Sequence, residues 1–308
     1  MAPTESEDNA KAFLAEFDSI KSTDVSSART DAFTSEDDFN GLSVELLIEV
    51  GSFICVAGNL LPAKTRRWDR NQAILGGHIV RLYKLISALL DQICQHRREI
   101  TFIIARLAFE CIVNIRFLIR FGGAATYDSY VRYSLRQERR LYERITKEIE
   151  ARRGETLPIE ERMLESIDKT VKASGLSIAG LSPSRPRDWA DKNLYERADA
   201  VGLGGTYIGT FGGPSSSVHG NWMDLLEFQL ETYHDEGNFS PDFDWHNPRP
   251  QIGQTVALLA VEAVREYFAH VGEGPVGFIE DRFTDLSNRI RQAMLAHEAF
   301  LNRPRESV

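Results

Sequence analysis

Residues 99–121 read EITFIIARLAFECIVNIRFLIRF, the most strongly apolar helical pattern in the sequence. Apolar residues surround the predicted helix on nearly every side, and a helix that is hydrophobic all round is a buried one. Yet Arg106, Glu110 and Asn114 recur at steps of four and therefore lie nearly one above another. Burying such groups is costly unless partners meet them. These three residues are therefore the candidate polar centre of the fold.

Long helical patterns also precede and follow this stretch. Residues 72–95 predict a second apolar helix, joined so tightly to the first that the two should pack antiparallel. Further helices are expected at 42–61 with Ser43 as N-cap, at 127–153, from Trp189 to Val201, and at 253–271 and 276–301. No strand periodicity or repeat stands out. The sequence predicts an all-α fold, an irregular multi-helix bundle built on the antiparallel pair.

Charge is unevenly distributed along the 308 residues. Of the formal net charge of −9, the ten acids and three bases of residues 1–42 contribute −7. This composition predicts a disordered or loosely docked N-terminal segment over 1–42, followed by a single helical domain over 43–303. Because the remaining body is close to neutral, the low isoelectric point does not exclude RNA as a partner.

Cysteine and histidine spacing gives no reason to expect a metal or another cofactor. Cys55, Cys94 and Cys111 all fall in apolar helical patterns, which predicts reduced, buried thiols. The acidic, aromatic stretch 234–251 reads as a long loop, and its histidines lack the i, i+4 spacing that places two ligands on one helix face. The N-terminus does not have the pattern of a secretion signal, and charge or glycine interrupts every apolar run. A cytoplasmic protein that does not span a membrane is expected.

A glycine-rich run between 202 and 213 precedes the second group of candidate residues. The serines at 215–217 are N-cap candidates for a helix running to about residue 233, with His219 in its first turn. A helix N-terminus favours the neutral form of an imidazole, which suits a general base. Tyr207, Ser217 and Asn221 stand near His219 in the sequence. The same histidine could equally be a structural one.

Four arginines, Arg132, Arg136, Arg140 and Arg144, recur at steps of four along the predicted helix over 127–153. One interpretation is an exposed helix face on which glutamates pair with the arginines. The other is a stripe that binds the phosphates of RNA or of a nucleotide. Both remain open at this point.

The order of these motifs resembles a large bacterial family of helical domains whose function is unknown. The resemblance spans about residues 70–235 and rests on Arg106-x3-Glu110-x3-Asn114, the arginine- and tyrosine-rich helix, Trp189, Tyr207 and Ser217-x-His219-Gly220. Members of that family resemble HEPN-type helical proteins, many of which are metal-independent ribonucleases in toxin–antitoxin and anti-phage systems. Those ribonucleases carry an arginine four to six residues before a catalytic histidine. This chain departs from that pattern, because residues 212–215 contain no arginine.

Two functions therefore remain open, and whether the protein is an enzyme is left undecided. In the first, a non-catalytic module binds a protein partner, a second copy or a small ligand through Arg106, Glu110 and His219. In the second, a HEPN-like ribonuclease uses His219 as the base, Arg106 as the phosphate contact and Glu110 to orient them. The second requires Arg106 and His219 to converge on one phosphate.

Overall fold

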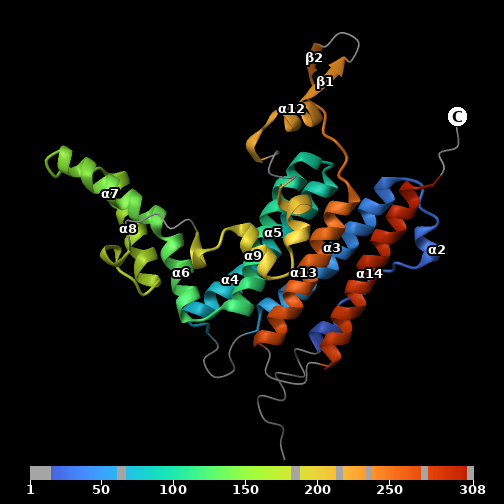
Figure 1. Cartoon of the computed structure of the whole chain (residues 1–308), viewed down its shortest axis with the longest axis horizontal. Helices are drawn as coiled ribbons and strands as arrows, with labels where there is room; N and C mark the ends of the chain where they lie inside the picture. The colour runs from blue at the N-terminus through green and yellow to red at the C-terminus, as the bar shows by residue number, and fades with distance from the viewer. Residues whose placement is uncertain are drawn as a thin grey trace, which may run out of the picture. The chain divides into compact units, whose positions relative to one another are not determined.

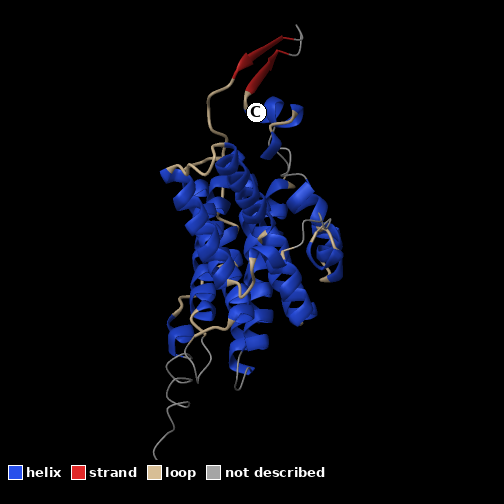
Figure 2. Ribbon diagram, turned by 90° about the vertical axis from the view of Figure 1, so that its left-hand side faces the viewer, coloured by secondary structure: helices blue, strands red, loops and turns tan. Residues whose placement is uncertain are grey.

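The computed structural model describes residues 15–60, 67–181, 188–212, 218–233, 238–271 and 277–303. It confirms the all-α prediction, since helices make up most of the described chain beside one two-stranded sheet (Figures 1 and 2). The chain divides into two compact units, a larger one of Met1–Ile119 with Ala198–Val308 and a smaller one of Arg120–Arg197. The larger unit is thus built from two separate parts of the chain.

Four long helices build the core of the larger unit: α3 (Glu36–Gly58), α4 (Arg70–Cys94), α13 (Pro250–Val271) and α14 (Gly277–Leu301). α3 packs against both α4 and α13, and α13 packs against α14. The apolar residues of each helix recur at helical spacing, as Leu46, Val50 and Phe53 do in α3, and these positions are buried. Burial of these apolar faces is the main driving force that holds the four helices together.

α3 and α4 are each long and apolar enough to cross a membrane, judged by length and composition alone. Core helices of soluble proteins meet the same criterion. In the most apolar window, 61% of α3 and 39% of α4 is buried inside the protein. The packing of α3 against two neighbouring helices already accounts for much of its apolar character, so this is weak evidence for a membrane span.

The antiparallel pair predicted from the sequence is confirmed. α5 (Arg98–Phe121) follows α4 after three residues, and both helices begin within two residues of their predicted starts. Midway along the pair, the Cys111 thiol donates a hydrogen bond to the carbonyl of His78 at 3.3 Å. The pair therefore brings the polar residues of α5 beside those of α4.

The predicted start of the first long helix, at residue 42 with Ser43 as N-cap, is wrong. α3 begins at Glu36, and Ser35 and Asp38 form a capping box in which the Asp38 amide donates to Ser35 Oγ at 3.3 Å. Ser43 lies buried within the helix and donates to the Phe39 carbonyl at 2.8 Å. The apolar pattern placed the start at the first leucine, whereas the capping residues lie in the acidic stretch.

Part of the acidic N-terminal segment packs into the core. Phe17 is fully buried, and its ring centroid lies 5.1 Å from that of Phe53, 5.9 Å from Phe268 and 6.0 Å from Phe283. A short helix, α2 (Ser27–Thr30), follows before α3. The change in composition at residue 42 is therefore not a structural boundary. Residues 1–14 lie outside the described residues.

The smaller unit contains α6 (Ala124–Ser134), α7 (Arg136–Ala151), α8 (Pro158–Ala173), the 3-10 turns η1 (Ile178–Gly180) and η2 (Trp189–Asp191), and the start of α9 (Leu194–Ala200). The prediction of a single helix over 127–153 is wrong, because the helix is interrupted at Leu135. Ser134 Oγ donates to the Tyr130 carbonyl at 2.8 Å, a back-bond that often bends helices. Leu135, with ψ of 0°, is buried at the break.

A β-hairpin lies where the sequence predicted helix and then loop. After α10 (Gly204–Tyr207), the π-helical turn η3 (Ile208–Gly212) and α12 (Trp222–Phe228), strand β1 (Leu230–Tyr233) pairs antiparallel with β2 (Asn238–Pro241). Leu230 lies opposite Pro241, and Tyr233 opposite Asn238. Residues 242–249 then lead into α13 without regular structure, as the predicted loop does.

Candidate functional site

The polar residues of α5 are less deeply buried than the sequence predicts. Asn114 is buried, whereas Glu110 and Arg106, one and two turns nearer the start of the helix, are half-buried and keep some access to solvent. The side-chain oxygen Oδ1 of Asn114 has no hydrogen-bond partner among the described residues. Along α5 the polar residues therefore run from two charged side chains with access to solvent to a buried amide whose oxygen can still accept a hydrogen bond.

Tyr207 packs against the side of α5 that carries these polar residues. The sequence placed Tyr207 near His219 and gave no sign of this contact. Its ring centroid is 6.2 Å from that of Phe109 on α5. Burial raises the pKa of Tyr207; the charge of Arg106 opposes this rise and that of Glu110 adds to it. Both charged groups thus act on the same phenolic hydroxyl. We call Arg106, Glu110, Asn114 and Tyr207 the polar centre.

His78 and Cys111 lie beside the polar centre in the α4–α5 interface. Cys111 Sγ is 3.7 Å from His78 Nδ1, which resembles a catalytic thiol–imidazole pair in distance. Burial, with a smaller contribution from Arg81, lowers the pKa of His78 to about 4. Burial raises the pKa of Cys111 to about 12, and Glu110 adds to this rise. Both groups are uncharged at neutral pH, so the thiol is not an activated nucleophile.

Cys111 is buried and reduced as predicted, but burial is wrong for the other two cysteines. Cys55 and Cys94 are free and exposed. Both lie on the outward sides of helices that are apolar over most of their length, and an apolar helix pattern alone does not distinguish the two sides. Among the described residues, no group of three histidine, cysteine or acidic side chains is arranged to hold a metal ion.

His219 does not join the polar centre. It is exposed and makes no hydrogen bond, ion pair or ring contact with any residue that the structure describes. The predicted cap Ser217 lies outside the described residues. The cap of α12 is Asn221, whose Oδ1 accepts from the Asp224 amide at 3.2 Å. Gly220, with φ of 57°, separates His219 from this helix, so His219 is not in the first turn of α12.

The four arginines of the predicted stripe do not share one helix, because α6 ends before Arg136. Each has a different partner within the smaller unit: Arg132 donates to the Gly180 carbonyl at 2.7 Å, Arg136 to the Tyr133 hydroxyl at 2.7 Å, Arg140 to Gln137 Oε1 at 3.5 Å, and Arg144 to Glu148 Oε1 at 3.0 Å. Arg132, Arg140 and Arg144 remain exposed. These contacts fit a solvated surface without requiring RNA.

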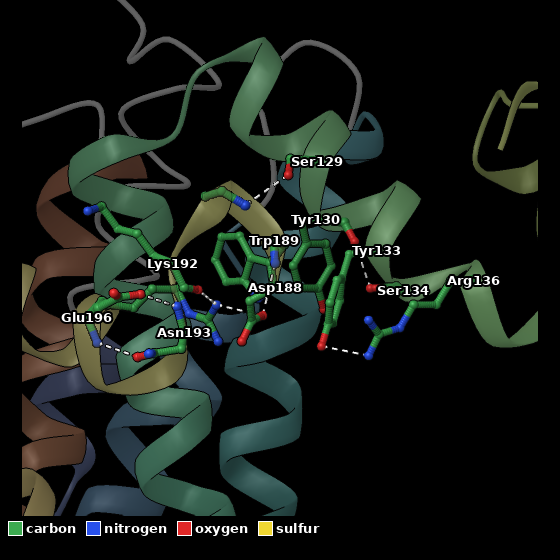
Figure 3. Close-up of polar contacts among 12 residues, drawn as sticks. Ser129, Tyr130, Tyr133, Ser134, Arg136, Asp188, Trp189, Lys192, Asn193 and Glu196 are labelled. Carbon is green, nitrogen blue, oxygen red and sulfur yellow. Dashed lines mark hydrogen bonds and ion pairs between the residues drawn. The ribbon is translucent and has the colours of Figure 1, made fainter. Parts of the chain in front are cut away.

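The Trp189 segment forms a strained turn in the smaller unit, where a helix from Trp189 to Val201 was predicted. Ala190 and Asp191 have φ of 55° and 54°, and such backbone costs about 1–3 kcal/mol per residue. Trp189 lies beside Tyr130 (Figure 3), and their ring centroids are 5.2 Å apart. The Ala190 amide donates to Ser129 Oγ at 2.9 Å. The regular helix, α9, begins only at Leu194.

A buried arginine holds this turn in place. The side chain of Arg197 is 3% exposed, donates to Asp188 Oδ1 at 2.9 Å and to the Lys192 carbonyl at 2.6 Å, and stacks 4.4 Å from the Trp189 ring centroid. These contacts compensate for the backbone strain. The Trp189 turn is therefore explained by its structural role.

Comparison with known proteins gives one match. A scan of family models matches residues 72–238, more than half of the chain, to a family described as a family of unknown function, DUF5677. The search of curated proteins and the search of solved structures found no match. The matched region contains every residue of the polar centre as well as His78 and Cys111. The chain therefore belongs to the DUF5677 family, whose function is unknown.

Proposed function

We propose that this protein is a helical module that binds a small polar ligand at the polar centre. The observation that carries the proposal is geometric: Tyr207 packs against Phe109 on α5, the helix on which Arg106 and Glu110 are half-buried and oppositely charged. Converging polar groups of different chemistry in a partly desolvated position are typical of ligand sites.

The groups present indicate the chemistry of the ligand. The guanidinium of Arg106 suits an anionic group, because its planar donors match carboxylate and phosphate oxygens. Glu110 and the free Oδ1 of Asn114 accept hydrogen bonds, so they suit N–H or O–H donors. The Tyr207 hydroxyl can do either. A ligand that carries an anion beside such donors, as free amino acids and ribonucleotides do, meets all four residues.

Thermal unfolding with a panel of the twenty amino acids and the common ribonucleotides tests this proposal. We expect at least one compound to raise the Tm of the wild-type protein, because a ligand that binds only the folded state stabilises it. Arg106→Gln and Tyr207→Phe should abolish the rise, whereas Tyr142→Phe, which removes a hydroxyl in the smaller unit, should preserve it. A compound that stabilises all four proteins equally binds elsewhere, and a panel without effect rejects the proposal.

A HEPN-like ribonuclease acting in a bacterial defence or toxin–antitoxin system is the alternative proposal. One observation favours it: His219 is exposed and unengaged by the described residues, as a base that must reach RNA would be. The mechanism also needs a cation beside that base, and no contact joins His219 to Arg106 within the described chain. Incubation with total RNA in EDTA tests the alternative. Cleavage by the wild type but not by His219→Ala would support it, and an equal absence of cleavage would reject it.

A further inference from the structure

Residues 242–249, which connect the hairpin to α13, are called the strap. Large apolar side chains are exposed on the strap, on α12 and on the hairpin. Phe243 is 89% exposed, Met223 65%, Trp222 56%, Trp245 53% and Phe239 46%. Trp222 on α12 packs edge-on against Phe239 on β2, with ring centroids 5.6 Å apart. The Asp242 amide donates to the Gln229 carbonyl at 2.9 Å and joins the strap to the end of α12. We call these five exposed residues the aromatic surface.

The strap that presents Phe243 and Trp245 is firmly attached. The Arg98 amide donates to the His246 carbonyl at 3.0 Å, and Arg98 Nε donates to the Asn247 carbonyl at 2.6 Å. One residue further, the Pro248 carbonyl accepts from Asn40 Nδ2 of α3 at 2.9 Å. The views of the larger unit in Figures 1 and 2 show the hairpin lying beyond one end of the long helices.

Protein interfaces commonly use aromatic side chains that an anchored segment exposes to solvent. Aromatic anchors bury a large area at little cost in side-chain entropy, and they dominate the energy of many interfaces. A two-stranded hairpin is also only marginally stable without further packing. The aromatic surface is therefore suited to be covered by another molecule.

The charge around these residues indicates which molecule. The described residues from 218 to 249 carry five carboxylates against Arg249, and Arg97 and Arg98 also contact the strap, so carboxylates remain in excess. Glu227 pairs with Arg249 at 3.8 Å, whereas the exposed Glu231 and Asp244 have no cation partner among the described residues. Trp245 already accepts a cation, since the Arg97 guanidinium lies 5.1 Å from its ring centroid. We propose that the aromatic surface docks a basic protein segment in which arginines alternate with apolar residues. The partner's apolar residues would cover Phe243 and Trp222 while its arginines pair with the surrounding carboxylates.

The same charge disfavours other occupants. Nucleic acid is repelled by the excess of carboxylates, and its affinity depends mainly on cations. A second copy that docked symmetrically would bring two acidic surfaces together, and like charges across an interface are costly. A basic protein segment lacks both disadvantages.

The full-length chain can be tested with a synthetic twenty-residue amphipathic peptide of arginine and leucine, and with a counterpart that has glutamate in place of arginine. By fluorescence anisotropy at low salt, the arginine peptide should bind and the glutamate peptide should not. The double variant Phe243→Ser/Trp245→Ser should weaken binding at least tenfold, and Glu231→Gln/Asp244→Asn should weaken it severalfold. Leu295→Ser, which removes an equally exposed apolar side chain from α14, should leave affinity unchanged.

Four results would overturn the proposal. The first is that the wild type does not bind the arginine peptide. The second is that the Phe243→Ser/Trp245→Ser variant binds it as tightly as the wild type. The third is equal binding of both peptides, since apolar contact alone would then explain the association. The fourth is that the variant abolishes self-association seen in light scattering, or partition into phosphatidylcholine vesicles, because the occupant would then be a second copy or a membrane.

Discussion

Two clusters of polar residues in the larger unit differ in how completely their hydrogen bonds are met. Around Glu49, the Oε1 and Oε2 atoms accept from the Arg289 guanidinium at 2.5 and 2.7 Å, and Oε2 also accepts from the Thr23 amide at 2.9 Å. Asp285 pairs with the same arginine at 2.8 Å. In the polar centre, by contrast, Asn114 Oδ1 has no partner among the described residues.

This difference fits a structural role for the Glu49 cluster and a binding role for the polar centre. A buried polar group that maintains the fold is most stable when its bonds are met within the protein, because each unmet bond costs about 1–3 kcal/mol. Groups that bind a ligand keep hydrogen-bond donors or acceptors without partners in the protein, and this lowers the free energy of unfolding. The Glu49 cluster meets the first description, and the polar centre meets the second.

The largest expected effect comes from Arg289→Met. It would leave the Glu49 carboxylate buried without its cation, which typically costs about 3–5 kcal/mol of unfolding free energy. Urea denaturation measures this loss. The matched control is Arg291→Met on the same helix, whose exposed arginine pairs with Glu262 at 3.3 Å and should cost less than about 1 kcal/mol. Similar losses for both variants would mean that the Glu49 cluster is not a buried, fully paired network.

A pH effect should arise from His78 beside the polar centre. Its pKa is about 4 in the folded protein, against an ordinary value of 6.5. As the pH falls below 6.5, His78 is protonated in the unfolded chain but stays neutral in the folded protein. The free energy of unfolding therefore declines until about pH 4. Above pH 6.5 this group has no effect on stability. Between pH 7 and pH 5 the loss is about 2 kcal/mol.

Urea denaturation at pH 7 and pH 5 measures this decline. Other groups contribute to any pH dependence, so the informative quantity is the difference between the wild type and His78→Gln. That variant should remove about 2 kcal/mol of the decline. If it declines as steeply as the wild type, protonation of His78 is not opposed by burial.

Two buried asparagines sharpen the comparison further. Asn40 Oδ1, like Asn114 Oδ1, has no partner among the described residues, but Asn40 Nδ2 donates to the Pro248 carbonyl at 2.9 Å. Asn40→Leu should therefore cost about 1 kcal/mol by removing that one bond. Asn114→Leu removes an oxygen that has no partner, so the free energy of unfolding should stay unchanged or rise, while ligand binding at the polar centre is lost. A clear destabilisation by Asn114→Leu would show that its amide is already satisfied.

Glu110→Gln should also have only a small effect on stability. The all-round apolar pattern predicts that Glu110 is buried, but it is half-buried, so we expect a cost of less than about 1 kcal/mol. The variant should instead lower the pKa of Tyr207, because the Glu110 charge raises it. An NMR titration of the tyrosine ring signals follows this pKa. No change would mean that Glu110 does not act on the hydroxyl.

The sequence predicts features that depend on local periodicity and misses those that depend on distant contacts. The α4–α5 pair follows from apolar spacing, and so does the alignment of Arg106, Glu110 and Asn114. The packing of Tyr207 over that stripe, and of Phe17 against Phe268, joins residues about 100 to 250 positions apart, so no local pattern reveals either. The break at Leu135, beside the hydrogen bond from Ser134 to the Tyr130 carbonyl, interrupts a continuous helical pattern and has no signal in the apolar spacing.

The two-part construction of the larger unit has a consequence for synthesis on the ribosome. α3 packs against α13, and roughly 200 residues separate them, so at about 5–20 residues per second α3 waits roughly 10–40 seconds for its partner. The smaller unit is continuous and is complete before α13 is translated. Of the long helices that pack on α3 in the described structure, only α4 has been translated by then. The nascent chain therefore exposes the other apolar side of α3, and a chaperone would find its binding site there.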